Sequence, residues 1–227
     1  FFLLGIILFS FSLYIYSTSG IRFFAMITPL GGFCFLIGWL FIIYETIKIN
    51  KKPYIIAEIG SNHNGDMELA KSIIGEAKRC GADCVKFQSF SPKSLVSNEE
   101  YRMNEKYTDS SKKHFGSLKE MVEKYYLRKE QHYELNEYCR QIDIDFASSP
   151  FSNEEVDILC DINVPFIKVA SMDINNLPFL EYIGSKNKPV ILSTGMAYIS
   201  EIEKALQIIE NTGNKQIILL HCISIYP

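Results

Sequence analysis

Paired cysteines, clustered histidines and excess basic charge are all missing from this sequence. Its 227 residues include six cysteines, none of them spaced as Cys-x-x-Cys, and four scattered histidines. The cysteine pattern argues against a disulfide framework and favours reduced, cytosolic thiols. Because a metal site needs three or four ligands, so few histidines predict no metal site within this chain.

Charge is also unevenly distributed. Residues 1–52 carry four basic residues and one acid, whereas residues 53–227 carry 19 basic and 25 acidic residues. A protein that binds nucleic acid needs a basic face for the phosphate backbone, so the acidic second region argues against a nucleic-acid partner. A small anionic substrate held by a few local lysines is compatible with this balance.

The first 44 residues contain almost no charge and include two apolar runs, 1–16 and 23–44. The second run reaches the ~20 residues that a helix needs to cross a bilayer. A signal peptide is the alternative, but no basic start or small-residue cleavage site indicates one. We therefore predict two transmembrane helices in residues 1–45, followed by a linker at 46–53. Three lysines after the second run (Lys48, Lys51 and Lys52) predict, by the positive-inside rule, a membrane-anchored chain whose remainder is cytoplasmic.

Beyond the linker, short apolar runs rich in β-branched residues alternate with helical stretches. Buried strands that alternate with helices predict an α/β fold with a parallel sheet. Asp66 and Ser200 are expected to cap two of the helices at their N-termini. A long polar insertion, residues 91–128, interrupts the pattern and is expected to be a functional loop. The predicted strands are 54–60, 84–90, 145–151, 166–171, 189–195 and 216–222.

Both an open doubly wound sheet and a (β/α)8 barrel fit this alternation. Polar residues occur near the C-terminal ends of the predicted strands, and a barrel gathers all of those ends at one face. An open sheet gathers only the ends beside a switch point. We therefore predict a TIM barrel over residues 54–227, truncated because about six strands are present instead of eight. The polar residues are Glu58, Lys86, Gln88, Ser148, Ser149, Lys168, Ser171, Ser193, Thr194 and His221.

Two of these residues, Lys86 and Lys168, lie within strands and are flanked by apolar residues. A lysine that snorkels to the rim is one explanation, and a Schiff-base lysine is another. Two such lysines on different strands favour one shared anion site, because a phosphate or carboxylate offsets the desolvation of both ammonium groups. The hydroxyls of Ser149, Ser171 and Ser193 would add hydrogen-bond donors to that site.

Glu58 is the acid predicted within a strand core. It is either a structural carboxylate or a general base made more basic by partial burial. Gln88 and Asp173 are expected either to bind sugar hydroxyls or to be ordinary polar residues of the rim. The stretch "SNHNG" after this strand predicts, taken alone, a plain turn. His221 on its own is weak evidence for a metal ligand.

Six motifs together resemble the sialic acid synthase family, whose enzymes make nonulosonic acids such as N-acetylneuraminate. They occur in order between Tyr54 and Pro227 as "IIAEIGSNHNGD", "GADCVKFQSF", "DFASSPF", "PFIKVASMDI", "KPVILSTGM" and "LLHCISIYP". Residues 1–45 separately resemble the C-terminal end of a small multi-pass membrane family of unknown function, in which "ITPxGG" and "GW" recur. Such a segment in front of an enzyme suggests a gene fusion or a frameshifted join.

The resemblance to sialic acid synthases implies a reaction. Phosphoenolpyruvate condenses with the open-chain aldehyde of an N-acyl sugar such as N-acetylmannosamine, phosphate leaves after C–O cleavage, and a divalent Mn or Mg ion polarises the aldehyde. By the same resemblance, Glu58 matches the acid that deprotonates the attacking water. Residues that match phosphoenolpyruvate contacts are Lys86, Ser149, Lys168, Ser171 and Ser193, and those on the sugar side are Gln88, Asp173, Ser224 and Tyr226. Full-length members of the family are cytoplasmic homodimers.

The sequence departs from this family after "HCISIYP". The family barrel continues with two more strands, which carry two metal-binding histidines and a second catalytic glutamate, and then with an antifreeze-like domain that reaches into the partner's active site. We therefore expect the metal ligands to lie beyond this chain, and the chain alone to be inactive. A membrane-tethered, non-catalytic sugar or phosphate binder and a joining artefact are the alternatives. The motifs do not name the acceptor sugar, because sialic and legionaminic acid synthases share them.

Overall fold

The computed structural model describes residues 6–49, 52–103 and 117–224. The chain divides into two compact units, Phe1–Pro53 and Tyr54–Pro227. Each unit is described by itself.

The first unit is helical. A π-helix, η1 (Ile7–Phe11), leads into α2 (Ser12–Ser19), and α3 (Arg22–Ile49) follows a turn at Gly20, whose φ is +68°. The backbone of α3 comes so close to η1 at Gly31 that a Cβ there would overlap the Phe9 backbone. Glycine at this position therefore permits the close approach of the two helices.

No helix within the described ranges is both long enough and apolar enough to cross a bilayer. The first predicted span is divided between a five-residue π-helix and an eight-residue α-helix, short of the ~20 residues that a span requires. The structure therefore does not support the prediction of two transmembrane helices in residues 1–45.

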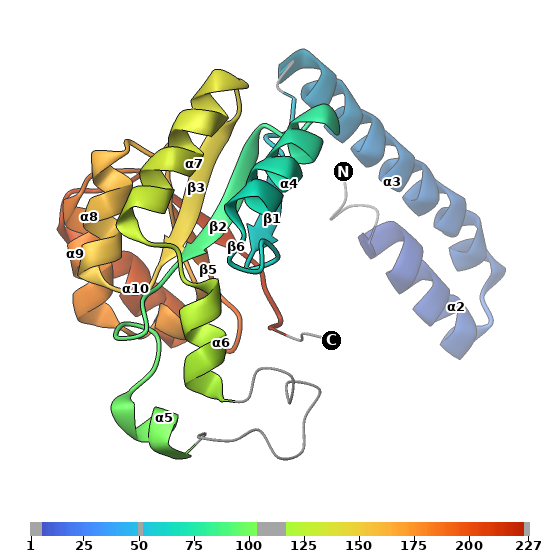
Figure 1. Ribbon diagram of the computed structural model, residues 1–227. Helices are drawn as coiled ribbons and strands as arrows, with labels where there is room; N and C mark the ends of the chain where they lie inside the picture. The colour runs from blue at the N-terminus through green and yellow to red at the C-terminus, as the bar shows by residue number, and fades with distance from the viewer. Residues whose placement is uncertain (1–5, 50–51, 104–116, 225–227) are drawn as a thin grey trace. The chain divides into compact units, whose positions relative to one another are not determined.

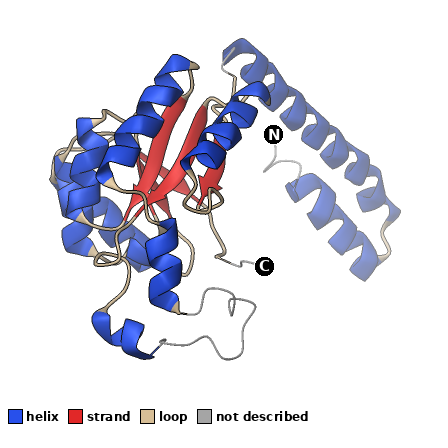
Figure 2. Cartoon of the chain, in the orientation of Figure 1, coloured by secondary structure: helices blue, strands red, loops and turns tan. Residues whose placement is uncertain are grey.

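The second unit alternates strands and helices as the sequence predicts. All six predicted strands are confirmed, each within two residues or so of its expected bounds (Figure 2). The strands are β1 (Ile56–Gly60), β2 (Cys84–Ser89), β3 (Asp145–Pro150), β4 (Ile167–Val169), β5 (Val190–Ser193) and β6 (Ile217–Leu220). The main helices are α4 (Met67–Arg79), α7 (Lys129–Gln141), α8 (Asn153–Asp161), α9 (Leu177–Ser185) and α10 (Ile199–Asn211), and a short 3-10 helix, η3 (Ser171–Asp173), follows β4.

The two predicted helix caps have different outcomes. Asp66 caps α4, where its Oδ1 accepts the backbone N–H of Glu68 at 2.9 Å and of Leu69 at 3.1 Å. Ser200 does not cap α10, because that helix begins two residues earlier than expected, after Tyr198. Instead, the side chain of Glu201 accepts the Tyr198 N–H at 2.8 Å. A glutamate therefore satisfies a backbone N–H at the start of this helix, which is the task predicted for Ser200.

The six strands form two parallel three-stranded sheets, β1-β2-β3 and β4-β5-β6, and β3 lies beside β4. The helices lie outside the strands: α4 packs against β1 and β2, and α7 and α8 pack against β3 (Figure 1). Within the first sheet, Glu58 is in register with Lys86, and Gln88 with Ser149.

The strand array is curled. Neighbouring strands are ~4.8 Å apart, so β1 and β4 would be separated by roughly 14 Å in a flat sheet. The ring of Tyr54 before β1 nevertheless meets the ring of Phe166 before β4, with centroids 6.4 Å apart. A small apolar cluster of Cys84, Ala147, Phe166 and Ile191 fills the inside of the curl, and the larger core lies between strands and helices. This is the layered arrangement of a (β/α) barrel, with six strands in the described residues.

The polar insertion 91–128 is not wholly a loop. It contains α5 (Asn98–Met103) and α6 (Leu118–Tyr125), and residues 104–116 lie outside the described residues. Its first segment is tied to the barrel, because the Ser94 hydroxyl donates to Glu155 Oε1 on α8 at 2.9 Å.

Candidate active site

Strand alternation decides which side chains enter the curled interior. Cys84, Ala147, Phe166 and Ile191 all face inward, in the small interior cluster. Because every second residue of a strand shares a face, the residues two positions further on also face inward. These are Lys86, Ser149, Lys168 and Ser193, which the sequence assigns to one anion site. Strand geometry therefore places all four side chains on one inner face, and anion binding by them stays a prediction.

Lys86 is the centre of this group. Its Nζ lies 2.7 Å from Glu58 Oε2 and donates to Ser149 Oγ at 3.2 Å, so it connects three neighbouring strands. The side chain of Lys86 is only 8% exposed, whereas that of Glu58 is 57% exposed. The predicted partial burial of Glu58 is thus wrong: β1 is an edge strand, and its carboxylate faces open space beside the lysine.

Lys168 belongs to the same neighbourhood. Burial lowers the pKa of its ammonium group, and the positive charge of Lys86 lowers it further, while Glu58, Cys222 and Asp173 act in the opposite direction. A charge shifts the pKa of a neighbouring group only when the two lie near one another, so Lys86 and Glu58 lie in the surroundings of Lys168. Two lysines on different strands therefore face the same interior, and the exposed Glu58 carboxylate pairs with one of them, Lys86.

Further hydroxyl groups lie at or just after the ends of the later strands. Ser193 is buried at the end of β5. Ser171 Oγ, in η3 after β4, accepts the backbone N–H of Gly195 at 3.1 Å. Ser224 lies near the same glycine, because a Cβ built on Gly195 would overlap the Ser224 hydroxyl. All four serines that the sequence singled out for substrate contact thus lie at or just after the strand ends β3 to β6, and the fifth predicted hydroxyl, that of Tyr226, lies outside the described residues.

Two further predicted residues have distinct surroundings. Gln88 Oε1 accepts the Ser61 hydroxyl at 3.2 Å, so the loop after β1 is tied to the end of β2. Asp173 is buried, and burial raises the pKa of its carboxyl group, although Asn176 and Lys168 oppose that change. Its Oδ2 has no hydrogen-bond partner among the described residues, while Oδ1 accepts from Asn176 Nδ2 at 3.5 Å. A buried acceptor without a partner is suited to a ligand hydroxyl.

Ser148 does not belong to the site. It precedes Ser149 in β3 and therefore points to the helix side, where its hydroxyl lies 2.6 Å from that of Ser89. Ser89 Oγ in turn lies 2.7 Å from Nε2 of the buried His132 on α7. Sequence reasoning missed His132, since a histidine in a polar helix carries no signal of its own without the neighbouring strand.

The stretch "SNHNG" does form the predicted turn, with left-handed backbone angles at Asn64 and Gly65. The buried residue of this turn is His63, whose Nδ1 accepts the Gly65 N–H at 3.1 Å and whose ring lies 5.8 Å from that of Phe87. Burial lowers the pKa of His63, which favours the neutral ring. The histidine thus fixes the turn that follows Glu58.

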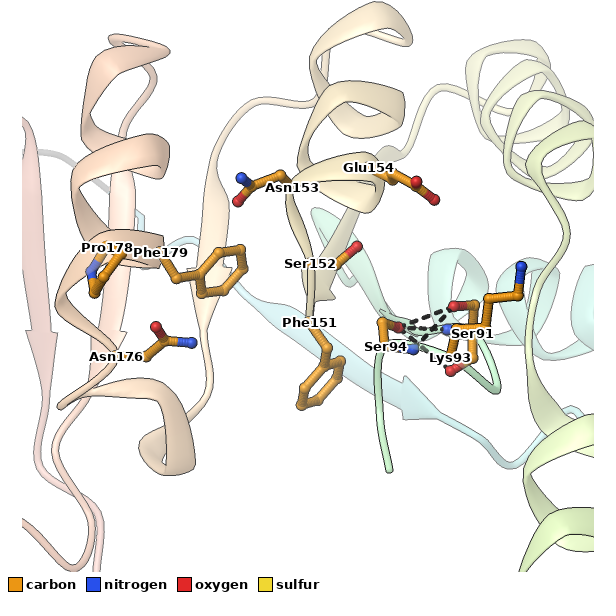
Figure 3. A pocket seen from close by; sticks show the side chains of 10 residues that line it. All are labelled: Ser91, Lys93, Ser94, Phe151, Ser152, Asn153, Glu154, Asn176, Pro178 and Phe179. Atoms are coloured by element: carbon orange, nitrogen blue, oxygen red, sulfur yellow. Dashed lines mark hydrogen bonds between the residues drawn. The ribbon is translucent and has the colours of Figure 1, made fainter. Parts of the chain in front are cut away.

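An open depression of about 530 Å³ lies over the loops after β2 and β3 and the start of α9 (Figure 3). It does not include Glu58, Lys86 or Lys168. Because the buried charges and inward-facing hydroxyls lie elsewhere, we place the site at the lysines rather than at this depression. The lining residues are Ser91, Lys93, Ser94, Phe151, Ser152, Asn153, Glu154, Asn176, Pro178 and Phe179.

The described residues do not fit a metal centre. In residues 6–49, 52–103 and 117–224, no three His, Cys, Asp or Glu side chains come together in a group that could hold an ion. His221, a weak metal candidate, instead borders a surface hollow with Thr194, Tyr198 and Cys222. The chemistry that the described site supports is binding of an anion by two ammonium groups and several hydroxyls, with a carboxylate beside them.

Comparison with known families decides the relationship. A model of the NeuB family matches residues 73–227. The chain belongs to the NeuB family. A second model, of a protein family of unknown function (DUF423), matches residues 1–32. The predicted resemblance to sialic acid synthases is confirmed for the second unit, as is the resemblance of the first segment to a family without known function.

Individual NeuB relatives are similar over most of this chain. An uncharacterized protein of Methanocaldococcus jannaschii is 45% identical over 81% of the chain and 52% of its own length. An N,N'-diacetyllegionaminic acid synthase of Campylobacter jejuni is 43% identical over 78% of the chain and 53% of its own length. Among solved structures, an N-acetylneuraminic acid synthetase of Leptospira borgpetersenii superposes with a TM-score of 0.64 at 34% identity, covering 78% of this chain and 56% of that one. The chain spans about half the length of the curated relatives it matches.

Proposed function

We propose that the Tyr54–Pro227 unit takes part in condensing phosphoenolpyruvate with the open-chain aldehyde of an N-acyl sugar, giving a nonulosonic acid and inorganic phosphate. The observation that carries this proposal is the convergence of Lys86 and Lys168 beside Glu58. Lys86 is buried and Lys168 half-buried, and two such ammonium groups destabilise a fold unless an anion is to be bound. Phosphoenolpyruvate supplies both a carboxylate and a phosphate.

The residues take complementary roles in this proposal. Lys86, Lys168 and the hydroxyls of Ser149, Ser171 and Ser193 bind the anionic groups of phosphoenolpyruvate. The reaction joins C3 of phosphoenolpyruvate to the aldehyde carbon and adds water at C2. The C2–O bond to phosphate then breaks. Glu58, held by Lys86, accepts the proton of that water. The aldehyde oxygen takes up a proton and becomes a hydroxyl, and the new C2 hydroxyl gives up its proton as phosphate leaves and the C2 carbonyl forms.

The sugar is proposed to lie on the side of Gln88, Asp173 and Ser224, with Tyr226 a further contact expected from the resemblance. Asp173 Oδ2, which has no hydrogen-bond partner within the described part of the chain, supports a contact with a sugar hydroxyl. A divalent ion supplies Lewis acidity in the reaction that the resemblance implies, but no residue among those described is assigned to hold it and no step here depends on it. The class of acceptor is an N-acyl hexosamine derivative, in keeping with relatives named as legionaminic and neuraminic acid synthases.

Glu58→Gln tests the proposal. We expect a version of the chain extended by the two further strands of the family barrel to release phosphate from phosphoenolpyruvate and N-acetylmannosamine with Mn or Mg. In that version, Glu58→Gln should lower the rate by at least 100-fold while phosphoenolpyruvate affinity changes little. Glu203→Gln, at an exposed position of α10, is the matched control and should leave the rate unchanged. A Glu58→Gln variant as fast as the wild type would refute the role of this carboxylate.

A second candidate function is binding of phosphoenolpyruvate or phosphate without turnover. The lysines and hydroxyls of the site favour it, because these groups bind an anion whether or not a bond is then made. Calorimetry and a phosphate-release assay on the extended version separate the two: a protein that binds phosphoenolpyruvate but releases no phosphate with any N-acyl hexosamine is a binder.

Two further parts of the proposal concern location and assembly. Residues 1–45 would associate with a membrane while the barrel unit lies in the cytoplasm, which liposome flotation tests. The protein would form a homodimer, which light scattering tests.

A further inference from the structure

Three loops meet at Gly195, which follows β5 in the stretch "LSTGM". Its backbone N–H donates to Ser171 Oγ, in η3 after β4, at 3.1 Å. The Ser224 hydroxyl, in the segment after β6, lies on the side of Gly195 to which a Cβ would project, as does Ser171 Oγ. The C-terminal ends of three successive strands thus make contact through one residue that has no side chain.

Glycine is needed at position 195 because no room is left there for a side chain, not because of its backbone angles. Gly195 is not among the glycines with positive φ, so its backbone conformation is open to other residues. A Cβ at this position would overlap the Ser224 hydroxyl, lie 2.9 Å from Ser171 Oγ and lie 3.1 Å from Ser224 Cβ. A methyl group would therefore displace both hydroxyls while leaving the chain able to fold, because a serine side chain can rotate away.

The neighbouring backbone indicates that this convergence is imposed by its surroundings. Met196 has φ +61° and Ser224 has φ +58°, both in the left-handed region that residues with a side chain rarely adopt. Such angles persist only where the surrounding structure holds them, and they concentrate at ligand-binding sites. Two of them flank the same contact.

The hydrogen bond from Gly195 also sets the direction of the Ser171 proton. A serine hydroxyl has one proton to donate and lone pairs that accept. Because Ser171 Oγ accepts the Gly195 N–H, its own proton is directed elsewhere, and Ser171 lies three residues after Lys168 in the chain. The hydroxyl is thereby prepared to donate to an oxyanion bound by that lysine.

We propose that Gly195 is a positioning residue of the anion site: its N–H holds the Ser171 hydroxyl as a donor, and its missing side chain admits the Ser224 hydroxyl beside it. The two hydroxyls then bind adjacent oxygens of phosphoenolpyruvate or of the sugar acceptor. This inference deepens the proposed function and rests on it. It adds a backbone position that none of the charged or hydroxyl residues of the site would reveal.

Gly195→Ala is the central variant, with Gly75→Ala as its control. Gly75 lies in α4, where an added Cβ would meet only the Tyr138 hydroxyl at an ordinary 3.6 Å. Calorimetry with phosphoenolpyruvate, and separately with inorganic phosphate, should show affinity at least tenfold weaker in Gly195→Ala and unchanged in Gly75→Ala. Thermal unfolding should show that both variants stay folded.

A suppressor variant distinguishes positioning from general damage. If the added methyl acts by displacing the Ser224 hydroxyl, Gly195→Ala in a Ser224→Ala background should weaken phosphoenolpyruvate binding by a much smaller factor than it does in the wild type. An equal factor in both backgrounds would overturn the proposal, because the effect of the methyl would then not pass through Ser224.

The hydrogen bond itself can be tested without any ligand. In the ligand-free chain, Ser171→Ala should speed exchange of the Gly195 amide hydrogen, measured by NMR, while amides of α4 keep their rates. Unchanged Gly195 exchange overturns the inference, whatever the binding data show. If exchange responds but the wild-type chain binds neither phosphoenolpyruvate nor phosphate, the proposed function fails, and the ligand role of Gly195 fails with it.

Discussion

His132 offers the sharpest test of how the barrel holds its strand ends. Its ring is buried on α7, with Nδ1 2.8 Å from the Arg128 carbonyl oxygen and Nε2 2.7 Å from Ser89 Oγ. A carbonyl can only accept, so Nδ1 carries the proton and Nε2 accepts the Ser89 hydroxyl, which leaves Ser89 to accept from Ser148. The variant to make is His132→Leu, which keeps the volume and removes both bonds.

The expected cost follows from this network. Two neutral hydrogen bonds contribute about 1 kcal/mol each, and one buried serine proton is left without an acceptor, which costs about 1–3 kcal/mol more. The greater apolar surface of leucine offsets part of this. We expect His132→Leu to lower the free energy of unfolding by about 2–3 kcal/mol, which lowers the Tm by roughly 5–10 °C for a unit of this size.

Urea unfolding followed by circular dichroism measures the effect, with Tyr133→Phe on the exposed side of α7 as the control. Burial lowers the pKa of His132 below its unfolded value of 6.5. A depressed histidine pKa contributes stability that is present above pH 6.5 and is lost as the pH falls through the folded pKa. The difference in unfolding free energy between wild type and His132→Leu should therefore be smaller at pH 5 than at pH 7.5. A difference in unfolding free energy below 0.5 kcal/mol at pH 7.5, or one that grows in acid, would refute the stabilising role of the His132 hydrogen bonds.

Two further variants test the site and the exposed strand. Lys86→Met should bind phosphoenolpyruvate at least tenfold more weakly in calorimetry, yet keep or slightly raise the urea midpoint, because it removes a buried charge that repels Lys168; a large loss of stability would show that Lys86 is structural. Ile218→Ser combined with Leu220→Ser should reduce concentration-dependent association in light scattering, because exposed apolar edge strands promote pairing between chains; an unchanged association constant would contradict this.

The strand ladder could be predicted from sequence because its signal is local. Apolar runs with β-branched residues predict buried strands whatever their neighbours, and all six were found. The face of the sheet on which each residue lies is not a local property: Ser148 and Ser149 looked equivalent, yet one contacts Ser89 and the other contacts Lys86. Only the register against β2 separates them, and one residue of slip would exchange their roles. The same holds for Ser200, which lost its predicted capping role when α10 began two residues earlier.

The lysine pair and Gly195 show the two kinds of functional signal that a sequence carries. Lys86 and Lys168 break a folding rule, since charges are placed where strands require apolar side chains, and such a conflict is visible in the sequence itself. Gly195 breaks no rule: a glycine after a strand is ordinary, and its backbone angle does not demand it. Its importance arises only when the segments after β4 and β6 reach the same point. Sequence therefore reveals the groups whose presence destabilises the fold, whereas the structure is needed to find a residue whose contribution is the space it leaves for two hydroxyls.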